Sequence, residues 1–319
     1  NPVLSNPNGR RLDRVFATLE YMISIDFYLN ETTRHAHLIL PAMAGLEGDH
    51  YPMLEYAMSV RNFARYAKAA VPPADAARPD WRILLDLVEA ITRARGGPWA
   101  LATPGLRLLA KGLGSGAILD ALLRGGPHRL RLRDLEQQVH GIDLGPLEPH
   151  IRACIATPDR KVNLVPKVFV ADLARLERKL AGTESEAAAA DRFVLVSRRT
   201  LRSMNSWLHN SLRLVRGRNR CTLLMHPENA ARLGVASGQT VRVRSRVGEI
   251  EVPIEVSDGV MSGVVSLPYG WGHDRLGTRL SVAREHAGAS LNDLADERSF
   301  DAVSGTSVID GIPVEIAPI

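Results

Sequence analysis

The first 41 residues combine a helical spacing of hydrophobic positions with two short apolar runs, a pattern that predicts an α/β segment. The helical stripe comprises Leu12, Val15, Phe16 and Leu19. Residues 22–27 then read as a buried strand that carries Asp26 near its end, and residues 37–40 read as a second strand. A polar turn, residues 30–33, separates the two strands. Helices alternating with strands favour a parallel sheet, in which ligands lie beyond the carboxyl ends of the strands.

Two strands are too few for a doubly wound sheet, because parallel strands must be covered on both faces. The sequence begins with Asn1 rather than methionine, and its first residues do not resemble a secretory signal. We therefore expect the missing strands to lie upstream of Asn1 and the chain to be a piece of a longer protein. Any export signal would also lie upstream, so the cytoplasm is the default location.

The middle of the chain is predicted to be helical. Residues 72–98 contain an amphipathic helix opened by Pro79 and Asp80, and residues 99–150 read as an all-helical insertion of short helices separated by glycines. A further helix is predicted over residues 166–180. Residues 183–192 have the composition of a linker.

The last 127 residues are predicted to be rich in β-structure. Short apolar or alternating runs predict strands at residues 193–196, 241–243, 250–256, 264–267 and 314–316. The second and third of these strands form a hairpin around a turn at Val247 and Gly248. Residues 227–233 predict a helix that has proline in its first turn and Gly234 just past its end. Many short strands of this kind favour a small barrel.

Composition excludes several classes of protein. The chain has 319 residues, of which 45% are hydrophobic and 24% charged, and this is too apolar for a disordered protein. No run reaches the roughly 18 consecutive apolar residues of a membrane-spanning helix. The only cysteines, Cys154 and Cys221, are far apart, which argues against a disulfide scaffold and a self-contained iron–sulfur cluster.

The positive charge of the chain is concentrated in one window. Residues 193–227 contain seven arginines and no acidic residue, so this window carries +7 while the net charge of the chain is +5. The rest of the chain therefore sums to −2, which favours a local anion site over a nucleic-acid footprint. Arginine favours bidentate recognition of phosphate or carboxylate. A solvated surface patch remains an alternative.

Three polar loops could carry chemistry. They are residues 198–210, which follow the first barrel strand, the glycine-spaced aromatic loop 267–273, and residues 288–294. The first can hold a pyrophosphate and bind the edge of a heterocycle, and glycines in the second permit close approach to a ligand. Each loop alone could also be a structural turn, and Trp207 and Trp271 could belong to the core.

Two weaker patterns favour structural interpretations. Residues 112–117 fit a relaxed G-x-G-x-x-A dinucleotide pattern, but no strand precedes them, so we interpret them as a helix-breaking loop. His35 and His37 lack further ligands at a recognisable spacing, so we interpret them as solvent-facing or loop residues. The sequence contains no nucleophile elbow and no evident acid–base pair, so no catalytic residue is assigned.

Taken in order, these segments resemble the carboxyl-terminal half of the molybdopterin-dependent oxidoreductases of the dimethyl-sulfoxide-reductase type. That family includes formate dehydrogenases and nitrate reductases. The resemblance is strongest in residues 1–66 and 193–319. The motifs that carry it are Asn1 with Pro2, Asp26, residues 30–33, residues 37–41, residues 198–210, residues 225–230, residues 266–273 and residues 290–292.

The resemblance implies a particular fold. It implies an α/β part, a partial doubly wound parallel sheet with a helical insertion, over residues 1–182. The linker 183–192 would lead to a β-rich, six-stranded double-psi barrel over residues 193–319. In such enzymes two molybdopterin guanine dinucleotides hold one molybdenum or tungsten, and each of these two domains binds one dinucleotide.

The resemblance also implies cofactor-binding residues. On the α/β side, Asn1 and Asp26 would contact nucleotide, Asp26 through the guanine edge, while Glu31 and Thr32 would line the same cleft. On the barrel side, the implied residues are Arg198, Arg199, Ser203, Asn205, Ser206, His209, Asn210, Trp271, His273 and Asn292. The arginine window suits pyrophosphate, and an aspartate at the end of a strand suits the N–H donors of guanine.

The family's cluster-binding cysteine segment and its metal-ligating cysteine, selenocysteine or serine do not occur in this sequence. We therefore expect no metal ligand and no iron–sulfur cluster from this chain. The leading hypothesis is the cofactor-clamping part of a molybdenum oxidoreductase, with the upstream half of the same enzyme, or a separate catalytic polypeptide, as its partner and a possible electron-transfer subunit. The alternative is a non-catalytic pterin-dinucleotide-binding or structural subunit.

Overall fold

A computed structural model describes residues 1–186 and 192–319. These residues form two compact units, and each is described by itself. The first unit comprises residues 1–22, 28–38 and 163–319, and the second comprises residues 23–27 and 39–162. This division follows spatial contacts, so the domain boundaries expected from the sequence stay a prediction.

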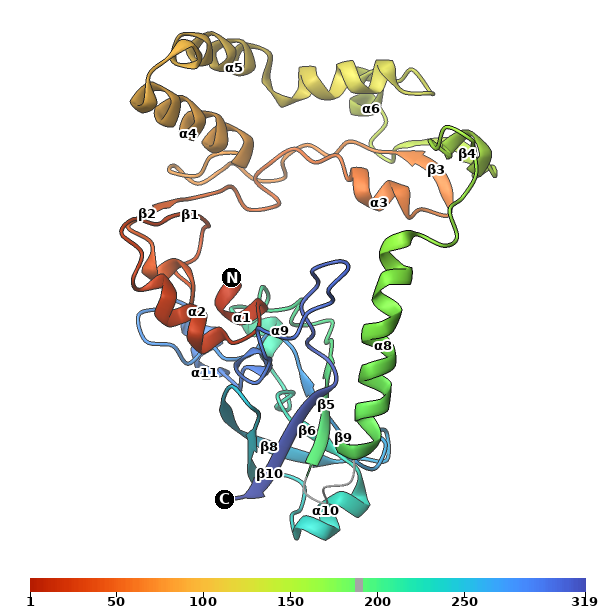
Figure 1. Ribbon diagram of the computed structural model, residues 1–319. Coiled ribbons are helices and arrows are strands. Elements are labelled where there is room, and N and C mark those ends of the chain that lie inside the picture. The colour runs from red at the N-terminus through yellow and green to blue at the C-terminus, as the bar shows by residue number, and fades with distance from the viewer. Residues whose placement is uncertain (187–191) are drawn as a thin grey trace. The chain divides into compact units, whose positions relative to one another are not determined.

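The first unit is built around a closed β-barrel (Figure 1). Its strands are β5 (Arg192–Arg198), β6 (Leu223–Met225), β7 (Thr240–Arg244), β8 (Glu249–Val256), β9 (Val264–Pro268) and β10 (Ile312–Pro318). The strand order around the barrel is β10-β5-β9-β6-β8-β7. The pairs β5–β9 and β6–β8 are parallel, and the remaining pairs are antiparallel. The predicted six-stranded double-psi barrel is confirmed.

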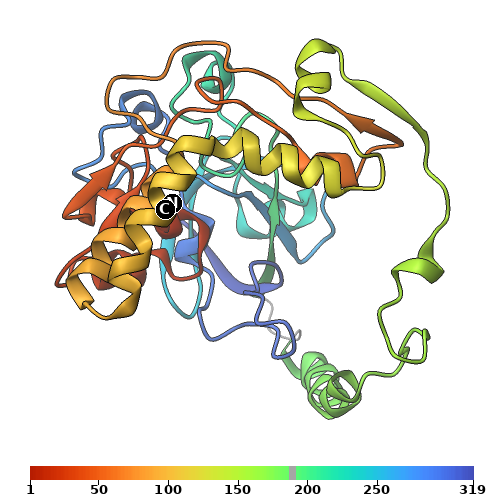
Figure 2. The same ribbon diagram turned by 90° about the horizontal axis from the view of Figure 1, so that it is seen from above.

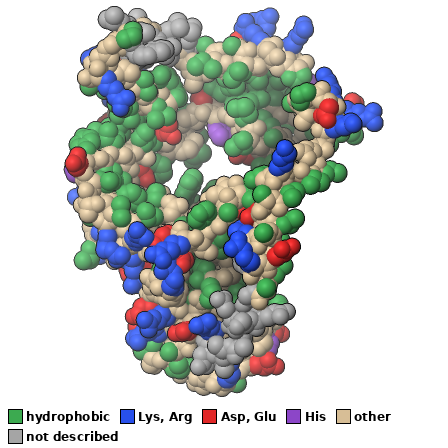
Figure 3. Space-filling model, viewed as in Figure 1, with side chains coloured by type: hydrophobic (Ala, Val, Ile, Leu, Met, Phe, Trp, Pro, Cys, Tyr) green, Lys and Arg blue, Asp and Glu red, His purple; other side chains and the backbone are tan. Residues whose placement is uncertain are grey.

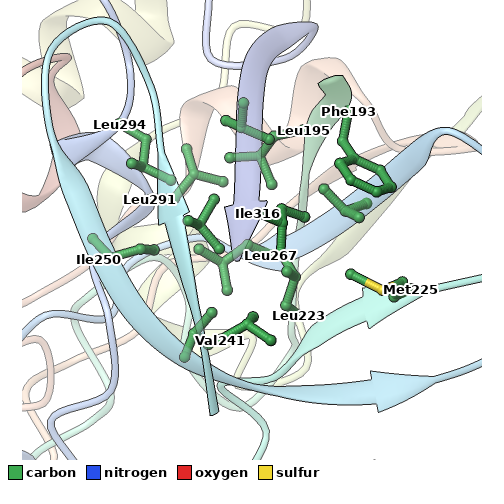
Figure 4. Close-up of a cluster of buried hydrophobic side chains, with 14 of the residues drawn as sticks. Phe193, Leu195, Leu223, Met225, Val241, Ile250, Leu267, Leu291, Leu294 and Ile316 are labelled. Carbon is green, nitrogen blue, oxygen red and sulfur yellow. The ribbon is translucent and has the colours of Figure 1, made fainter. Parts of the chain in front are cut away.

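The alternating sequence pattern directs one set of side chains into the barrel. In the β7–β8 hairpin, Val241 lies opposite Val252 and Val243 opposite Ile250, and all four side chains are buried. The core also takes Leu195 and Leu223, which are fully buried (Figure 4). Successive side chains on a strand point to opposite faces. Because the apolar residues occupy every second position, they all point into the barrel.

Short helices and turns surround the barrel. Helix α10 (Pro227–Leu233) ends at Gly234, whose φ of 67° lies in the left-handed region, as the sequence predicted. Helices α9 (Leu212–Val215) and α11 (Ser281–Glu285) and the 3-10 turn η2 (Leu291–Asp293) lie in the connections.

The amino-terminal segment belongs to the same unit as the barrel. Helices α1 (Pro2–Ser5) and α2 (Gly9–Phe16) precede the 3-10 turn η1 (Thr33–His35). The backbone N–H of Asn8 donates to the carbonyl of Ala295, and Arg10 is paired with Asp293 at 3.0 Å. Residues from the two ends of the sequence are therefore joined within one unit.

Helix α8 (Lys167–Glu186) also belongs to this unit and extends beyond the predicted 166–180. It continues through residues 183–186 of the expected linker, and residues 187–191 lie outside the described residues. Figure 3 shows hydrophobic side chains exposed along α8. Those at helical spacing are Phe169, Leu173, Leu176 and Leu180.

The second unit contains two small sheets and several helices. Strands β1 (Ile23–Ile25) and β2 (Leu38–Leu40) form one pair, and β3 (Arg61–Ala64) pairs antiparallel with β4 (Ile142–Pro146). The helices are α3 (Met53–Ala57), α4 (Asp80–Arg95), α5 (Pro98–Gly125), α6 (Leu132–Gln137) and α7 (Ile151–Cys154). Helices α4 and α5 pack side by side (Figures 1 and 2). A small core forms around Ala64, Tyr66 and Leu135.

The prediction of an all-helical insertion over residues 99–150 is wrong. Strand β4 lies within it, because Ile142 and Leu144 alternate inward and pack on the small core. Within α5 the backbone of Gly114 is not helical, with a φ of 69°, so this glycine divides α5 into two helices. This confirms the interpretation of residues 112–117 as a helix-breaking segment. Among the described residues, none of the helices is both long and apolar enough to cross a membrane.

Candidate functional site

The first unit contains a cavity of about 370 Å³ beside the barrel. Its lining comes from the loops after β5, from the segment before β6 and from residues 285–288. The charged or titratable side chains in the lining are Arg202, Arg218, Arg220, His209, Glu285 and His286. Three arginines against one glutamate make this an electropositive cavity, as an anion site requires.

The loop over residues 200–210 is fixed by its own hydrogen bonds. The buried hydroxyl of Ser203 donates to the carbonyl of Thr200 at 3.0 Å and lies 2.6 Å from the Thr200 hydroxyl. Asn205 has a φ of 59°, in the left-handed region. Gly270, with a φ of 97°, passes so close that a Cβ there would lie 2.1 Å from the carbonyl oxygen of Asn205. The glycine at position 270 therefore allows the loop 267–273 to pack directly against the loop 200–210.

Packing around Trp271 closes one side of the cavity. A Cβ on Gly288 would lie 2.2 Å from the Trp271 ring and 2.7 Å from the sulfur of Cys221. The His209 ring lies against Trp271, with ring centroids 4.3 Å apart. Burial raises the pKa of the Cys221 thiol to about 11, so this cysteine is a packing residue in its protonated form.

Three buried titratable side chains form a chain of hydrogen bonds beside the cavity. Glu31 Oε1 lies 2.9 Å from His273 Nδ1, and His273 Nε2 lies 2.6 Å from His209 Nδ1. The second oxygen of Glu31 accepts from the amide of Asn1 at 2.7 Å. Glu31 and His273 are completely buried, and His209 is 3% exposed.

The environment fixes the charge of both ends of this chain. Burial acts to raise the pKa of Glu31, but hydrogen bonding and charge from His273, together with Asn1, outweigh it, so the pKa lies below its usual value. Burial, and then the charge of His273, lower the pKa of His209 to about 3. Glu31 is therefore a carboxylate and His209 a neutral imidazole at neutral pH.

Thr32 and Asn1, two further predicted residues, support Glu31. The Thr32 hydroxyl donates to the side-chain oxygen of Asn1 at 2.8 Å and accepts from the backbone N–H of Val3 at 3.0 Å. The structure thus brings Asn1, Glu31 and Thr32 together with His209 and His273 of the barrel loops. It does not place Asp26 with them. That residue belongs to the second unit, where its backbone N–H donates to the carbonyl of Leu40 at 3.3 Å.

The first two predicted arginines point in different directions. The guanidinium of Arg198 donates to the backbone carbonyls of Ser266 and Thr222, the latter at 2.6 Å, and to the Thr222 hydroxyl at 3.1 Å. Burial lowers its pKa. Arg199 lies over the ring of Tyr269 at 4.3 Å and donates to the side chain of Asn205. Arg198 is thus occupied by the barrel itself, whereas Arg199 is exposed.

The remaining predicted residues have distinct positions. Asn210 accepts from the backbone N–H groups of Val282 and Ala283 at the start of α11, at 3.1 and 3.3 Å. Ser206 is half-buried in the loop. Asn292 is fully buried near Tyr269; burial raises the pKa of Tyr269, and hydrogen bonding with the Asn292 side chain acts against that rise.

Several cavity residues were not assigned as cofactor-binding residues from the sequence. They are Arg202, Arg218, Asn219, Arg220 and His286. The acid-free arginine window includes all three of these arginines, so the sequence did contain a signal for them. Among the described residues, no group of three His, Cys, Asp or Glu side chains could hold a metal ion.

The fold and the cavity define a protein with a six-stranded barrel, an electropositive cavity beside it, and α/β elements near the amino terminus. Comparison with known proteins narrows this class. A model described as the Molydopterin dinucleotide binding domain matches residues 193–312, and one described as Molybdopterin oxidoreductase matches residues 1–90. The chain therefore contains regions of both domains, and its homologues are molybdopterin enzymes of the dimethyl-sulfoxide-reductase type.

Similar proteins include several enzymes. The chain is 24% identical to an F420-dependent formate dehydrogenase 1 subunit alpha of Methanococcus maripaludis, over 84% of this chain and 37% of that protein. It is 32% identical to an assimilatory nitrate reductase catalytic subunit of Bacillus subtilis, over 30% of this chain and 13% of that protein. It is 24% identical to a dimethyl sulfoxide/trimethylamine N-oxide reductase of Rhodobacter capsulatus, over 86% of this chain and 35% of that protein.

A solved structure supports the fold. Acetylene hydratase from Pelobacter acetylenicus matches with a TM-score of 0.67 and 15% identity, over 99% of this chain and 43% of that one. The chain thus spans well under half the length of the proteins it matches.

Proposed function

We propose that this chain binds molybdopterin guanine dinucleotide and is the cofactor-clamping part of a molybdenum-dependent oxidoreductase that acts on a small substrate, as formate dehydrogenases and nitrate reductases do. The observation that carries the proposal is the electropositive cavity, which lies within the residues matched by the dinucleotide-binding model. Its three arginines suit the pyrophosphate of such a cofactor.

The residues present fit this cofactor. His209 Nε2 and the hydroxyl of Ser290 are buried without a hydrogen-bond partner. Buried polar groups left unpaired are costly, so a polar ligand that meets them gains binding energy. A pterin dinucleotide has many donors and acceptors, and when bound it supplies the redox chemistry through its metal.

The chain's own contribution is binding and orientation. Arg202, Arg218 and Arg220 would hold phosphate oxygens, and His209 and Asn292 would fix the orientation of the bound group. Asp26, in the second unit, stays a prediction for contact with guanine. Partners supplying the metal ligand and passing electrons are part of the same proposal, and the cytoplasmic location stays a prediction.

The proposal is tested on native material purified through this chain. We expect molybdenum or tungsten by elemental analysis, GMP released by acid hydrolysis, and at least one longer or additional polypeptide by intact mass. A complex with neither metal nor pterin would contradict the proposal. Metal and pterin without any redox turnover would instead support the non-catalytic binding subunit.

A paired substitution tests the cavity itself. Arg218→Ala combined with Arg220→Ala should lower the GMP content of the purified complex. Arg213→Ala is the matched control, because Arg213 lies in the same arginine window but does not line the cavity. Equal GMP in the double variant and the control would place the dinucleotide elsewhere.

A further inference from the structure

The first unit contains a second cavity, of about 780 Å³, that shares no lining residue with the first. Barrel strands β5, β7 and β10 and the segments around residues 294–299 and 308 supply its lining. The charged residues in the lining are Arg192, Arg244, Arg246, Asp296 and Glu315. The apolar ones are Leu294, Val308, Ile312, Pro313 and Val314. The proposed function leaves this mixed charged and apolar cavity unused.

The register of β10 explains why a cavity forms at this place. β10 pairs with β5 over residues 312–315 and with β7 over residues 315–318. Strands β7 and β10 therefore separate on the amino-terminal side of Glu315. The lining residues 311–315 and 244–246 lie on the two sides of this separation.

The turn between β7 and β8 forms a fixed wall of the cavity. A Cβ on Gly248 would lie 2.5 Å from the carbonyl oxygen of Asp293, so the turn packs directly against the backbone there. Arg246, in the same turn, is ion-paired with Asp296. Close packing and an ion pair thus hold this wall in place without a ligand.

Three charged side chains form a row across the strands. Glu315 lies opposite Arg192 on one side and opposite Arg244 on the other. All three are exposed and have buried neighbours along their strands, so they share the outer face of the barrel. Directly opposite residues on antiparallel strands have Cβ atoms about 4.5–5.5 Å apart, so the two guanidinium groups can reach one ligand.

The charges of this row are not balanced. Among the residues that the structure describes, neither Arg192 nor Arg244 forms an ion pair, whereas Arg246 is paired with Asp296. Three arginines against two acidic residues leave the lining with a net charge of +1. One further negative charge therefore neutralises the cavity.

We infer that this cavity binds a single carboxylate group carried on an apolar stem, with the carboxylate held by Arg192 and Arg244. A guanidinium matches a carboxylate through two parallel hydrogen bonds. A phosphomonoester, with a charge of about −1.5 to −2, would overcompensate the lining and be repelled by Glu315. The apolar residues of the lining favour the stem, because burying apolar surface stabilises the complex. The inference does not rest on the proposed function, since the two cavities are separate.

The first test compares three small probes on the full, unmodified chain by titration calorimetry. Hexanoate has both the carboxylate and the stem, acetate lacks the stem, and 1-hexanol lacks the charge. We expect hexanoate to bind at least about tenfold more tightly than either of the others. Equal binding of hexanoate and 1-hexanol would overturn the role of the carboxylate, and equal binding of hexanoate and acetate the role of the stem.

Substitutions of opposite sign locate the carboxylate. Arg192→Gln combined with Arg244→Gln should lower the affinity for hexanoate at least about tenfold. Arg242→Gln is the matched control, because Arg242 is exposed on the same strand as Arg244 but does not line the cavity. Unchanged affinity in the double variant would overturn the assigned position of the carboxylate.

Glu315→Gln should have the opposite effect. It keeps the size of the side chain and removes the negative charge of the row, so the affinity for hexanoate should rise by about twofold to fivefold. Glu251→Gln, an exposed position outside the cavity, should leave it unchanged. A fall in affinity in Glu315→Gln, with an unfolding temperature equal to that of the unmodified chain, would contradict the charge argument.

A last comparison identifies the source of the carboxylate. A blocked tripeptide with glutamate between two leucines carries the same chemistry on a polypeptide, and its glutamine counterpart is the uncharged control. Tighter binding of the acidic peptide than of hexanoate would support a side chain of a partner polypeptide, and the reverse a free carboxylic acid. Binding of neither would overturn the inference, while the metal and GMP content of the native complex would still test the proposed function separately.

Discussion

Arg198 is predicted to stabilise the barrel rather than to bind a ligand. It ends β5, and its guanidinium donates to the carbonyl of Ser266 on β9 and to the carbonyl and hydroxyl of Thr222, just before β6. One side chain thus bridges three segments of the barrel. Replacing it with methionine keeps much of its length and removes every one of these donors.

The magnitude follows from the acceptors left behind. Ser266 and Thr222 are 5% and 9% exposed, so their carbonyls have little access to water. A buried acceptor that loses its partner costs about 1–3 kcal/mol. With two such carbonyls, Arg198→Met should lower the free energy of unfolding by about 2–6 kcal/mol. For a unit of this size, at about 2–4 °C per kcal/mol, that corresponds to a fall in Tm of about 4–24 °C.

Two further variants sharpen the assay, which is thermal and urea unfolding of the chain without any ligand. Arg198→Lys keeps the charge but lacks the forked geometry, so it should recover only part of the loss. Arg199→Met is the control, since Arg199 is exposed and its contact with the Tyr269 ring is worth about 0.5–1 kcal/mol. If Arg198→Met unfolds within about 0.5 kcal/mol of the unmodified chain, the structural role is wrong.

Three other predictions concern backbone strain, core packing and pH. Gly270→Ala should destabilise the protein by more than about 2 kcal/mol in urea unfolding, because a Cβ would collide with a neighbouring carbonyl. Gly238→Ala, with a similar positive φ but open space, should cost only about 1–2 kcal/mol, and equal losses would contradict the steric argument. Leu223→Ala should cost about 2–5 kcal/mol and Leu201→Ala, at a 99% exposed position, less than about 0.5 kcal/mol in the same assay. Folding lowers the pKa of His209 from 6.5 to about 3, so between these pH values the unfolded chain binds a proton at His209 that the folded chain does not. The free energy of unfolding should therefore fall as the pH falls below 6.5, by up to about 1.4 kcal/mol per pH unit. Urea midpoints measured downward from neutral pH should therefore fall less steeply in His209→Gln, and identical slopes would refute this assignment.

The barrel could be predicted where its strands alternate. The β7–β8 hairpin and β10 follow a strict period of two, and the structure confirms them. Strand β6 was not predicted, because Leu223–Met225 is too short to show a period and its partners lie far along the chain. Strand β4 was missed for a related reason, since its pairing with β3 is a long-range contact that local composition does not report.

The candidate site was predictable by residue type but not by arrangement. Glu31, His209 and His273 were each named from a family resemblance, yet nothing in the sequence indicated that they touch. The contacts join positions 64 and 242 residues apart, and they depend on how the loops after β5 and β9 meet the polar turn. Close approach at Gly270 is part of that geometry, and the sequence showed it only as a glycine in an aromatic loop.

The arginines of the window 193–227 have two different roles in the structure: some bind the barrel's own carbonyl groups, and others line the cavity. A run of arginines without acids predicts that an anion is bound nearby, but a guanidinium is satisfied equally well by backbone carbonyls. Arg198 has taken the second role because it ends a strand and reaches back across the barrel, where carbonyls need donors. Arg218 and Arg220 precede β6 and line the cavity. There Arg220 also donates to the carbonyl of Arg216 at 3.3 and 3.4 Å, and Arg218 lies 3.6 Å from Glu255. The position of each arginine relative to the end of its strand, rather than its charge, therefore decides whether it stabilises the barrel or is available to a ligand.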